Sequence, residues 1–334
     1  MSLEDICRRN TERALEANAR MPNWPPDKRG VPNSVLRSGL FGAFGRGKRK
    51  FMHKEPIASV AGISIFYTGQ QLDQSDLDVW EGILHLSRDL PLGTRVEFTA
   101  RGILRLIDRG GATGGSIGSS DREWLKNVFR RLKATDVECQ QGPYIYSGSL
   151  IDEYFRDDSN GRYVVRLNPR LKLLFNRSGW TSVDWKIRST LRGHPLAQWL
   201  HGFYSSHAEP LPYKVATLHR LCGSGTGAGA ATVVEMNKAL QGWRDATLAP
   251  AFRALENACN SHEQAFTWDI PGGELVMVNR EPSKSQEKHL QRKSPDVKTH
   301  AGPGDSIRGN RGMRSESRGQ HQTKAGERMG NFGG

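Results

Sequence analysis

The chain has 334 residues and a formal net charge of +13, which is long enough for two domains that each bury a core. Its four cysteines, at positions 7, 139, 222 and 259, form no CxxC pair, so neither a zinc site nor a disulfide framework is expected. No apolar run approaches about 18 residues, and the N-terminus lacks the apolar segment of a signal peptide. We therefore expect a soluble cytoplasmic protein without a bound metal or a membrane partner.

The positive charge is concentrated at the two ends of the chain. Residues 1–54 contain 12 lysines and arginines against 5 acidic residues, and residues 281–334 contain 11 against 6. Residues 55–280 contain 25 against 24, a net charge of +1. Basic arms are typical of proteins that bind nucleic acid, although they can also simply maintain solubility. We interpret 1–54 as a flexible basic arm and 281–334, which repeats Arg-Gly, as a disordered tail.

The segment from 55 to 178 is predicted to form one unit of helices and strands. Its expected elements are a strand over 63–69, helices over 76–88, 98–110 and 120–133, and a hairpin over 144–168. Thr99 is placed to cap the second helix, and Ser120 with Glu123 matches a capping box. Asn160-Gly161 is a hairpin turn signal.

The segment from 179 to 280 repeats this order. Its expected elements are helices over 195–206 and 214–223, a helical stretch over 233–259, and a hairpin over 265–279. Pro250 interrupts the helical stretch, because proline removes a helical hydrogen bond. Either this stretch is one kinked helix, or Thr247 caps a second short helix with Pro250 in its first turn.

Helix, helix, glycine-rich turn, helix and hairpin is the order of a winged helix. The predicted fold class is therefore α+β, with tandem winged-helix domains at 55–178 and 179–280 between disordered basic N- and C-terminal arms. The glycine-rich loops at 110–118 and 224–230 each follow a helix and lack Gly-Lys, which argues against a nucleotide site. The histidines match no metal-binding or nicking-enzyme motif. We expect neither a cofactor nor catalytic activity.

The predicted helix over 120–133 has an almost purely positive face. Its apolar residues cover one side, and its cations cluster within about 80° on the other side at ~100° per residue. These cations are Arg122, Lys126, Arg130 and Lys133. We interpret them as a phosphate-contacting face, the alternative being an ordinary solvated face. Arg162 lies on the following hairpin, where a wing could contact the DNA backbone.

Two further groups of residues are candidates for DNA binding. In the helical stretch, Lys238, Arg253 and Asn257 lie away from the apolar stripe, with Arg244 at its flank. Arginine and asparagine can pair bidentately with guanine and adenine edges, although each of these residues could simply face solvent. In the N-terminal arm, the remaining candidates are Arg46, Lys48, Arg49 and Lys50. We predict that these four add affinity along the DNA backbone without reading sequence, the alternative being a solvated linker.

Several stretches of the chain are similar to a known family. They are VPNSVLRSGLF (31–41), IFYTGQQL (65–72), DLDVWEGILHLSRDLPLGTRVEFT (76–99), LKNVFRRLKAT (125–135) and FYSSHAEPLPYKVATLHRLCGS (203–224), followed by Trp243-Arg244. On these residues the chain resembles the TrfA-type plasmid replication initiators, which belong to the iteron-binding proteins built from two winged helices. The resemblance spans about residues 31–280.

The resemblance implies a bacterial, non-catalytic initiator that binds directly repeated origin sequences in double-stranded DNA. It also implies opening of an adjacent A·T-rich region, recruitment of the host initiator DnaA and the replicative helicase, control of plasmid copy number, and a possible homodimer. The second winged helix would be the main base reader. No clamp-binding segment of the Gln-Leu-x-Leu-Phe type occurs before residue 31, so the sequence does not support contact with the sliding clamp.

Two other functions fit the same pattern. Tandem winged helices also suit a transcriptional repressor that binds an operator, and basic arms suit a structural or partitioning protein that coats DNA. A nicking enzyme is the least supported of the alternatives.

Overall fold

The computed structural model describes residues 20–45, 47, 49–109, 117–142, 144–175, 179–224 and 232–293. The predicted site residues Arg46 and Lys48, most of both glycine-rich loops and residues 294–334 of the predicted tail lie outside this described part. The described part of the tail, 281–293, includes helix α11 (Lys284–Lys293), so the prediction of disorder is wrong for these residues.

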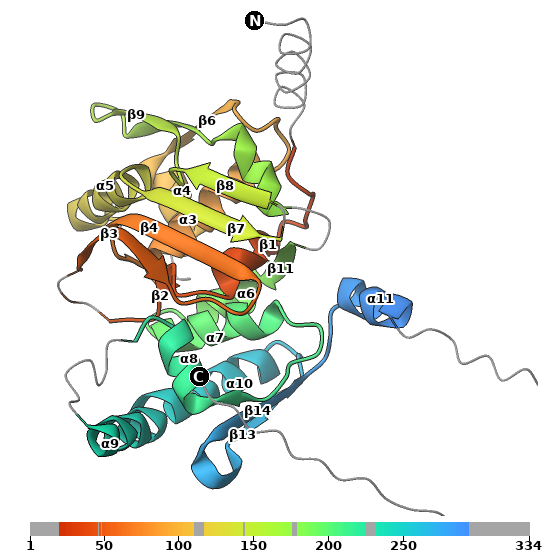
Figure 1. Cartoon of the computed structure of the whole chain (residues 1–334). Helices are drawn as coiled ribbons and strands as arrows, with labels where there is room; N and C mark the ends of the chain where they lie inside the picture. Colours follow the sequence, from red (N-terminus) through yellow and green to blue (C-terminus); the bar gives the residue numbers. More distant parts are fainter. Residues whose placement is uncertain are drawn as a thin grey trace, which may run out of the picture. The chain divides into compact units, whose positions relative to one another are not determined.

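The first winged helix is present. Its elements are α3 (Gln74–Ser87), β6 (Arg95–Thr99), α4 (Ala100–Leu106), α5 (Ser119–Lys133), β9 (Glu153–Asp157) and β10 (Arg162–Arg166) (Figure 1). The three strands form an antiparallel sheet in the order β6-β10-β9. Thr99 caps α4 as predicted, because its hydroxyl oxygen accepts a hydrogen bond from the Gly102 N–H at 2.9 Å.

The second winged helix repeats the same order. Its elements are α7 (Pro195–Ser205), β12 (Tyr213–Lys214), α8 (Val215–Leu221), α9 (Val233–Trp243), a π-helical turn (Arg244–Leu248), α10 (Ala249–Asn260), β13 (Phe266–Asp269) and β14 (Leu275–Arg280). Its sheet order, β12-β14-β13, again places the first strand beside the third. The prediction of two tandem winged helices is therefore confirmed.

The first unit carries an additional four-stranded sheet that the sequence did not reveal. It contains β3 (Phe51–Ile57), β4 (Ile63–Gln70), β7 (Asp136–Gln141) and β8 (Tyr144–Gly148), all antiparallel in that order. The prediction of one hairpin over 144–168 is wrong at its first strand, because β8 pairs with β7. Only β9 and β10 form the wing, and Gly161 with φ of 69° completes their turn as predicted.

The described part of residues 1–54 is not a flexible arm. β1 (Lys28–Pro32) pairs antiparallel with β11 (Trp180–Asp184), and α2 (Asn33–Leu36) and β2 (Phe41–Gly42) follow it. Trp24, Val31 and Phe41 are buried in the core. The net charge of the segment suggested that its arginines face solvent. Arg29 and Arg37 instead donate to backbone carbonyl groups of the protein, so they fit into a folded segment.

Residues 20–44 join the two winged helices, and we call this segment the N-terminal clasp. One hydrophobic core contains buried residues from Met21 to Trp185, and the second contains residues from Ile187 to Val276. The clasp contacts α7 and α8 of the second unit: Trp199 donates its indole N–H to the Ser38 carbonyl at 3.0 Å, and the Ala43 N–H donates to the Cys222 carbonyl at 2.8 Å.

Leu36 of α2 packs closely against Gly202 of α7. A Cβ atom built on Gly202 would lie 2.8 Å from Leu36 Cδ2, which is closer than van der Waals contact allows. The C-terminal end of α7 is then capped by two arginines. Arg37 Nε donates to Ser206 Oγ at 2.9 Å, and Arg280 donates to the Tyr204 carbonyl at 2.8 Å. The Tyr204 carbonyl also accepts from the His207 backbone N–H at 3.1 Å, so Arg280 adds a second donor at the end of the helix.

The helical stretch over 233–259 resolves into one continuous run. The Ala249 N–H donates to the Arg244 carbonyl, five residues earlier, which defines the π-helical turn directly before Pro250. Leu248 has helical angles of φ −71° and ψ −51°, so Thr247 does not cap a separate helix. The wider turn accommodates the proline, which is typical of π-bulges.

Helix capping at α5 differs from the prediction. Asp121, rather than the pair Ser120 and Glu123, closes the start of the helix by accepting from the Gly118 N–H at 3.2 Å. A capping box that the sequence analysis missed opens α9, where Thr232 and Glu235 each accept a hydrogen bond from the other's backbone N–H at 3.2 Å.

Candidate nucleic-acid interface

Helix α5 presents its cations because its apolar side is fixed on the sheet. Leu125, Val128, Phe129 and Leu132 are fully buried. The Phe129 ring lies 4.8 Å from the ring of Tyr163 on β10. The opposite side of the helix therefore faces outward, and the predicted residues Arg122, Arg130 and Lys133 are exposed there.

Two of the predicted cations in this region have acidic partners. The Lys126 ammonium lies 3.4 Å from Asp158 Oδ1 on the wing and 3.9 Å from Glu123 Oε2. Arg162 on the wing remains 65% exposed, with its guanidinium 3.8 Å from Glu97 Oε2. An anionic ligand can therefore reach Arg162 but competes with Asp158 at Lys126.

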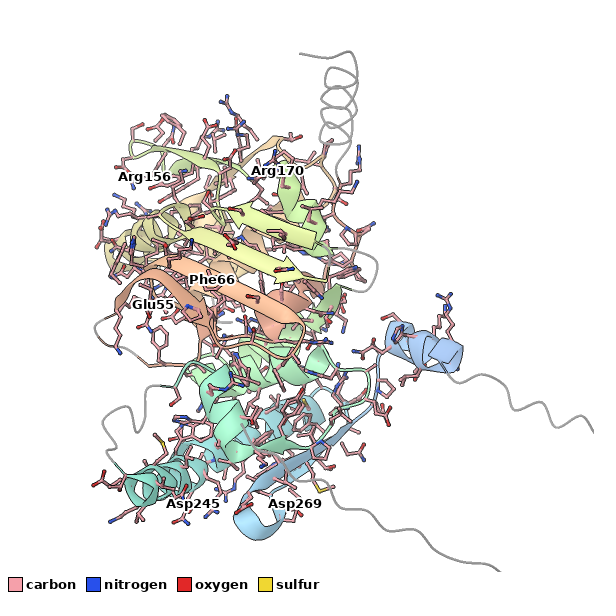
Figure 2. All side chains as sticks on the ribbon, viewed as in Figure 1. Glu55, Phe66, Arg156, Arg170, Asp245 and Asp269 are labelled. Atoms are coloured by element: carbon pink, nitrogen blue, oxygen red, sulfur yellow. The ribbon has the colours of Figure 1, made fainter. Side chains whose placement is uncertain are left out.

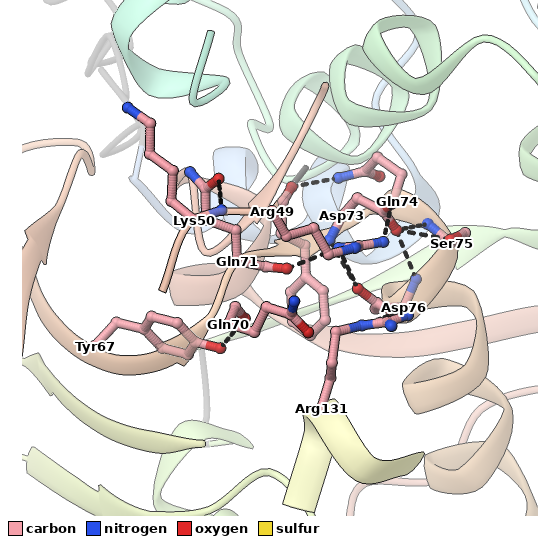
Figure 3. A network of polar contacts seen from close by, with 11 residues as sticks. Arg49, Lys50, Tyr67, Gln70, Gln71, Asp73, Gln74, Ser75, Asp76 and Arg131 are labelled. Carbon is pink, nitrogen blue, oxygen red and sulfur yellow. Dashed lines mark hydrogen bonds and ion pairs between the residues drawn. The ribbon is translucent and has the colours of Figure 1, made fainter. Parts of the chain in front are cut away.

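Arg49 is not a free cation of an arm, which corrects its predicted role. Its guanidinium forms ion pairs with Asp73 and, at 2.9 Å, with Asp76, and only 16% of its side chain is exposed (Figure 3). Asp76 is fully buried and also accepts from Arg131 on α5 at 2.6 Å. Burial and the neighbouring Asp73 raise the pKa of Asp76, and the two arginines oppose that shift.

Lys50 remains available at the same place. Its side chain is exposed, and its backbone N–H donates to Gln71 Oε1 at 3.1 Å. The network around Asp76 therefore ties the chain just before β3 to the recognition helix α5 (Figure 3). Of the four predicted arm cations, Lys50 is the described one that faces solvent.

The recognition helix of the second unit is unusually exposed over its first part. Within the described range 233–243 of α9, only Trp243 is buried, and Lys238 on this helix is exposed. Arg253 and Asn257 lie one turn apart on α10 and are both exposed. Asn237 and Gln241, which the sequence analysis missed, also lie on α9, away from the core. Their amide side chains match base edges. Gln241 lies three residues after Lys238 and four residues after Asn237, so the helical spacing could have identified both.

Arg244 ties the recognition helix to the second wing. Its Nε donates to Asp245 Oδ1 at 2.7 Å, and its Nη1 donates to the Gly273 carbonyl in the wing turn at 3.2 Å. Asp245 and Asp269, both labelled in Figure 2, line a shallow surface depression beside this turn. These bonds give Arg244 a structural role that the predicted base contact did not include.

A fully buried arginine connects the two winged helices. Arg188, on α6 (Trp185–Thr190), donates to Asp78 at 2.8 Å and lies 3.2 Å from Glu81 Oε2, both on α3. It also donates to the Gln198 carbonyl of α7 at 3.5 Å. Burial raises the pKa of Glu81 to about 7. This cluster joins α6 and α7 to α3 of the first winged helix.

A large concave surface lies between α5 and the start of α7. It encloses about 850 Å³ and is lined by five arginines against two aspartates, together with Trp124. Arg109 is stacked on that indole ring, 3.7 Å from its centroid. Arg109 also pairs with Asp121 at 3.1 Å, and Arg49 and Arg131 pair with Asp76, so much of the positive charge at this surface is already compensated.

The described residues also bear on two other kinds of site. Among the residues that the structure describes, no group of three or more His, Cys, Asp or Glu side chains is arranged to hold a metal ion. Among the helices of the described ranges, none has the length and apolar composition needed to cross a membrane.

Comparison with known proteins identifies the family. The family model described as TrfA protein matches residues 14–251. The chain belongs to the TrfA family. The plasmid replication initiator protein TrfA of Escherichia coli is 28% identical over 211 residues, covering 60% of this chain and 53% of that protein. The chain thus spans about half the length of this TrfA relative.

Two solved structures match larger parts of this chain at low sequence identity. Domains 2 and 3 of RctB match with a TM-score of 0.46 and 13% identity, over 75% of this chain and 98% of that one. The Pi initiator protein in complex with iteron DNA matches with a TM-score of 0.44 and 10% identity, over 62% and 91%. The predicted resemblance to TrfA-type proteins is confirmed by the family match.

Proposed function

We propose that this protein is a plasmid replication initiator that binds directly repeated sequences in double-stranded DNA through both winged helices. The observation that carries the proposal is the pair of recognition helices, α5 and α9–α10, which both present exposed polar or cationic side chains beside a wing. Membership of the TrfA family supports the same function.

The two units have different tasks in this proposal. Helix α5 contacts phosphates through Arg122, Arg130 and Lys133, since its outward face carries cations and few groups that discriminate bases. The second recognition helix reads bases through Lys238, Arg253 and Asn257. Arginine and asparagine pair bidentately with guanine and adenine in the major groove. Lys50 and Arg162 add backbone contacts on the side of the first unit.

The later steps of initiation extend the proposal. Binding at the repeats would help to open an adjacent A·T-rich region and to recruit the host initiator DnaA and the replicative helicase, in the cytoplasm of a bacterium. The protein acts in this scheme by binding, without a cofactor and without catalysis, as a monomer or a homodimer. The name of the TrfA relative supports the assignment to replication initiation.

Footprinting of the DNA that flanks the gene tests the proposal. We expect several discrete protected sites of similar sequence at regular spacing. Uniform protection without discrete sites would instead indicate a DNA-coating protein and would reject the proposal.

A replication assay separates an initiator from a repressor. The protein and its repeats are supplied together on a plasmid that lacks its own initiator. Maintenance of that plasmid is expected for an initiator. Discrete footprints without plasmid maintenance would identify an operator-binding repressor.

A further inference from the structure

The wing of the first unit ends in an acidic turn that lies against the recognition helix. Asp157 and Asp158 come at the end of β9, and the Asp158 side chain is 57% exposed. A wing that contacts DNA directly is expected to carry cations at its tip, because the backbone is a dense row of negative charges. The acidic residues at this position therefore need an explanation.

Asp158 holds two cations at once. Its carboxylate accepts from Arg156 at 2.7 Å and 3.1 Å through two nitrogens, and Lys126 Nζ lies 3.4 Å from its Oδ1. Arg156 lies on the wing (Figure 2), and Lys126 lies on α5. The hydrogen bond from Arg156, followed by that from Lys126, lowers the pKa of Asp158, so the carboxylate is charged at neutral pH.

The bound carboxylate resembles a DNA phosphate in its chemistry. A guanidinium group recognises carboxylate and phosphate with the same bidentate geometry. Lys126 is four residues from both Arg122 and Arg130, which places it in the middle of the cationic face of α5. An internal anion therefore occupies the centre of the surface that the proposed function assigns to the backbone.

We propose that Asp158 is an internal competitor of DNA phosphate, which Lys126 and Arg156 must release before these two cations can bind the backbone beside Arg122 and Arg130. This inference rests on the proposed function. Its consequence is a lower affinity for DNA of any sequence, so that stable binding depends on the base contacts of the second winged helix. Lys126 is 27% exposed and Arg156 is 26% exposed in this pairing, so both are accessible to an incoming strand.

The variant Asp158→Asn tests the competition on duplex DNA of random sequence. An exposed ion pair changes an equilibrium constant by a factor of about two to five. We therefore expect Asp158→Asn to bind random-sequence DNA more tightly than the unmodified protein by about that factor. The plot of log affinity against log salt should become steeper by roughly 0.9 to 1.8, because one or two further phosphates gain cationic contacts. Binding is measured by fluorescence anisotropy over a series of salt concentrations.

Two variants with the same change of charge serve as controls. Glu138→Gln lies on an exposed position of β7, and Asp157→Asn alters a carboxylate that is bonded to Ser159 and Asn160 within the turn. Neither is expected to change the salt slope. A further comparison adds Lys126→Ala to each background, and the loss of affinity should be larger in the Asp158→Asn protein than in the unmodified protein.

The outcomes separate the inference from the proposed function. If the unmodified protein binds DNA and Asp158→Asn binds with the same affinity and slope, the competition is rejected. An equal gain in Glu138→Gln would also reject it, because the effect would then come from net charge alone. If neither protein binds any DNA, including the flanks of the gene, the proposed function itself fails.

Discussion

At the scale of single residues, charge in the interior decides how the two units are joined. Arg188 is fully buried and compensates two carboxylates of α3. Its sequence neighbour Lys186 is exposed on the same short helix. Removal of one partner from a buried ion pair leaves an uncompensated charge, which is far more costly than removal of an exposed charge.

We expect Arg188→Met to lower the free energy of unfolding by about 3–5 kcal/mol, because Asp78 and Glu81 lose their partner. Denaturant unfolding of the full chain measures this change. Lys186→Met is the matched control, and it should alter stability by less than about 0.5 kcal/mol. Equal effects of the two substitutions would show that Arg188 does not join the units.

Buried histidines predict how stability depends on pH. Burial lowers the pKa of His207 to about 4, and that of His85 also to about 4, compared with an ordinary value of 6.5. The unfolded chain therefore takes up protons at a higher pH than the folded protein does. Stability from these groups is present above pH 6.5 and is lost as the pH falls toward 4.

Glu81 acts in the opposite direction over part of this range. Its pKa is about 7 in the folded protein, compared with an ordinary value of 4.5. The stabilisation that Glu81 contributes is therefore complete below pH 4.5 and is lost as the pH rises toward 7. We expect the histidines to dominate, so that the free energy of unfolding falls between about pH 6.5 and 4. His207→Gln should reduce this slope by at most about 1.4 kcal/mol per pH unit. Denaturant unfolding at a series of pH values checks the change, and an unaltered slope would contradict it.

At the scale of elements, the two recognition helices differ in how they meet solvent. Helix α5 packs one complete side on its own sheet, whereas α9, within its described range 233–243, buries only Trp243 and continues through a π-helical turn into α10. The π-helical turn is bonded to the second wing through Arg244. The polar side chains of α9 and α10 are therefore held beside that wing.

Substitutions on the two helices should have different effects on DNA binding. Neutralising Arg122, Arg130 and Lys133 on α5 is expected to weaken binding to DNA of every sequence. The slope of log affinity against log salt should become shallower by roughly 0.9 for each phosphate contact that is lost. Arg253→Ala or Asn257→Ala on α10 should cost about 1–3 kcal/mol at the repeats and relax the choice of base at one position. Binding isotherms on repeat and random DNA distinguish these outcomes, and a uniform weakening from both helices would contradict the division of tasks.

At the scale of the whole molecule, the N-terminal clasp determines which residues form the folded unit. β1 pairs with β11, a strand far away in the sequence, and the clasp bonds to helices of the second unit. A protease can cleave β1 only after the strand separates from β11. Since this separation breaks the hydrogen bonds between the two strands, we expect β1 to resist proteolysis.

Limited proteolysis with trypsin should show this protection. We expect slow cleavage after Arg29, which is buried, and after Arg37, which is partly buried, and faster cleavage after the exposed Lys54. Mass spectrometry of the fragments identifies the sites. Rapid cleavage after Arg29 and Arg37 in the native protein would mean that residues 1–54 behave as the flexible arm that the charge pattern indicated.

The sequence by itself determined the repeated winged-helix order, the hairpin turn at Gly161, the Thr99 cap and the cationic face of α5. Each of these depends on periodicity or on neighbouring residues, so the information lies within a few turns of chain. Only the tertiary structure decided that residues 20–44 are a clasp, that 144–148 joins a second sheet, and that Arg49 and Lys126 already have acidic partners. Those outcomes depend on strand pairs and ion pairs between segments that are separated in the sequence. The local sequence around one strand or one charged residue does not indicate which other segment it will contact.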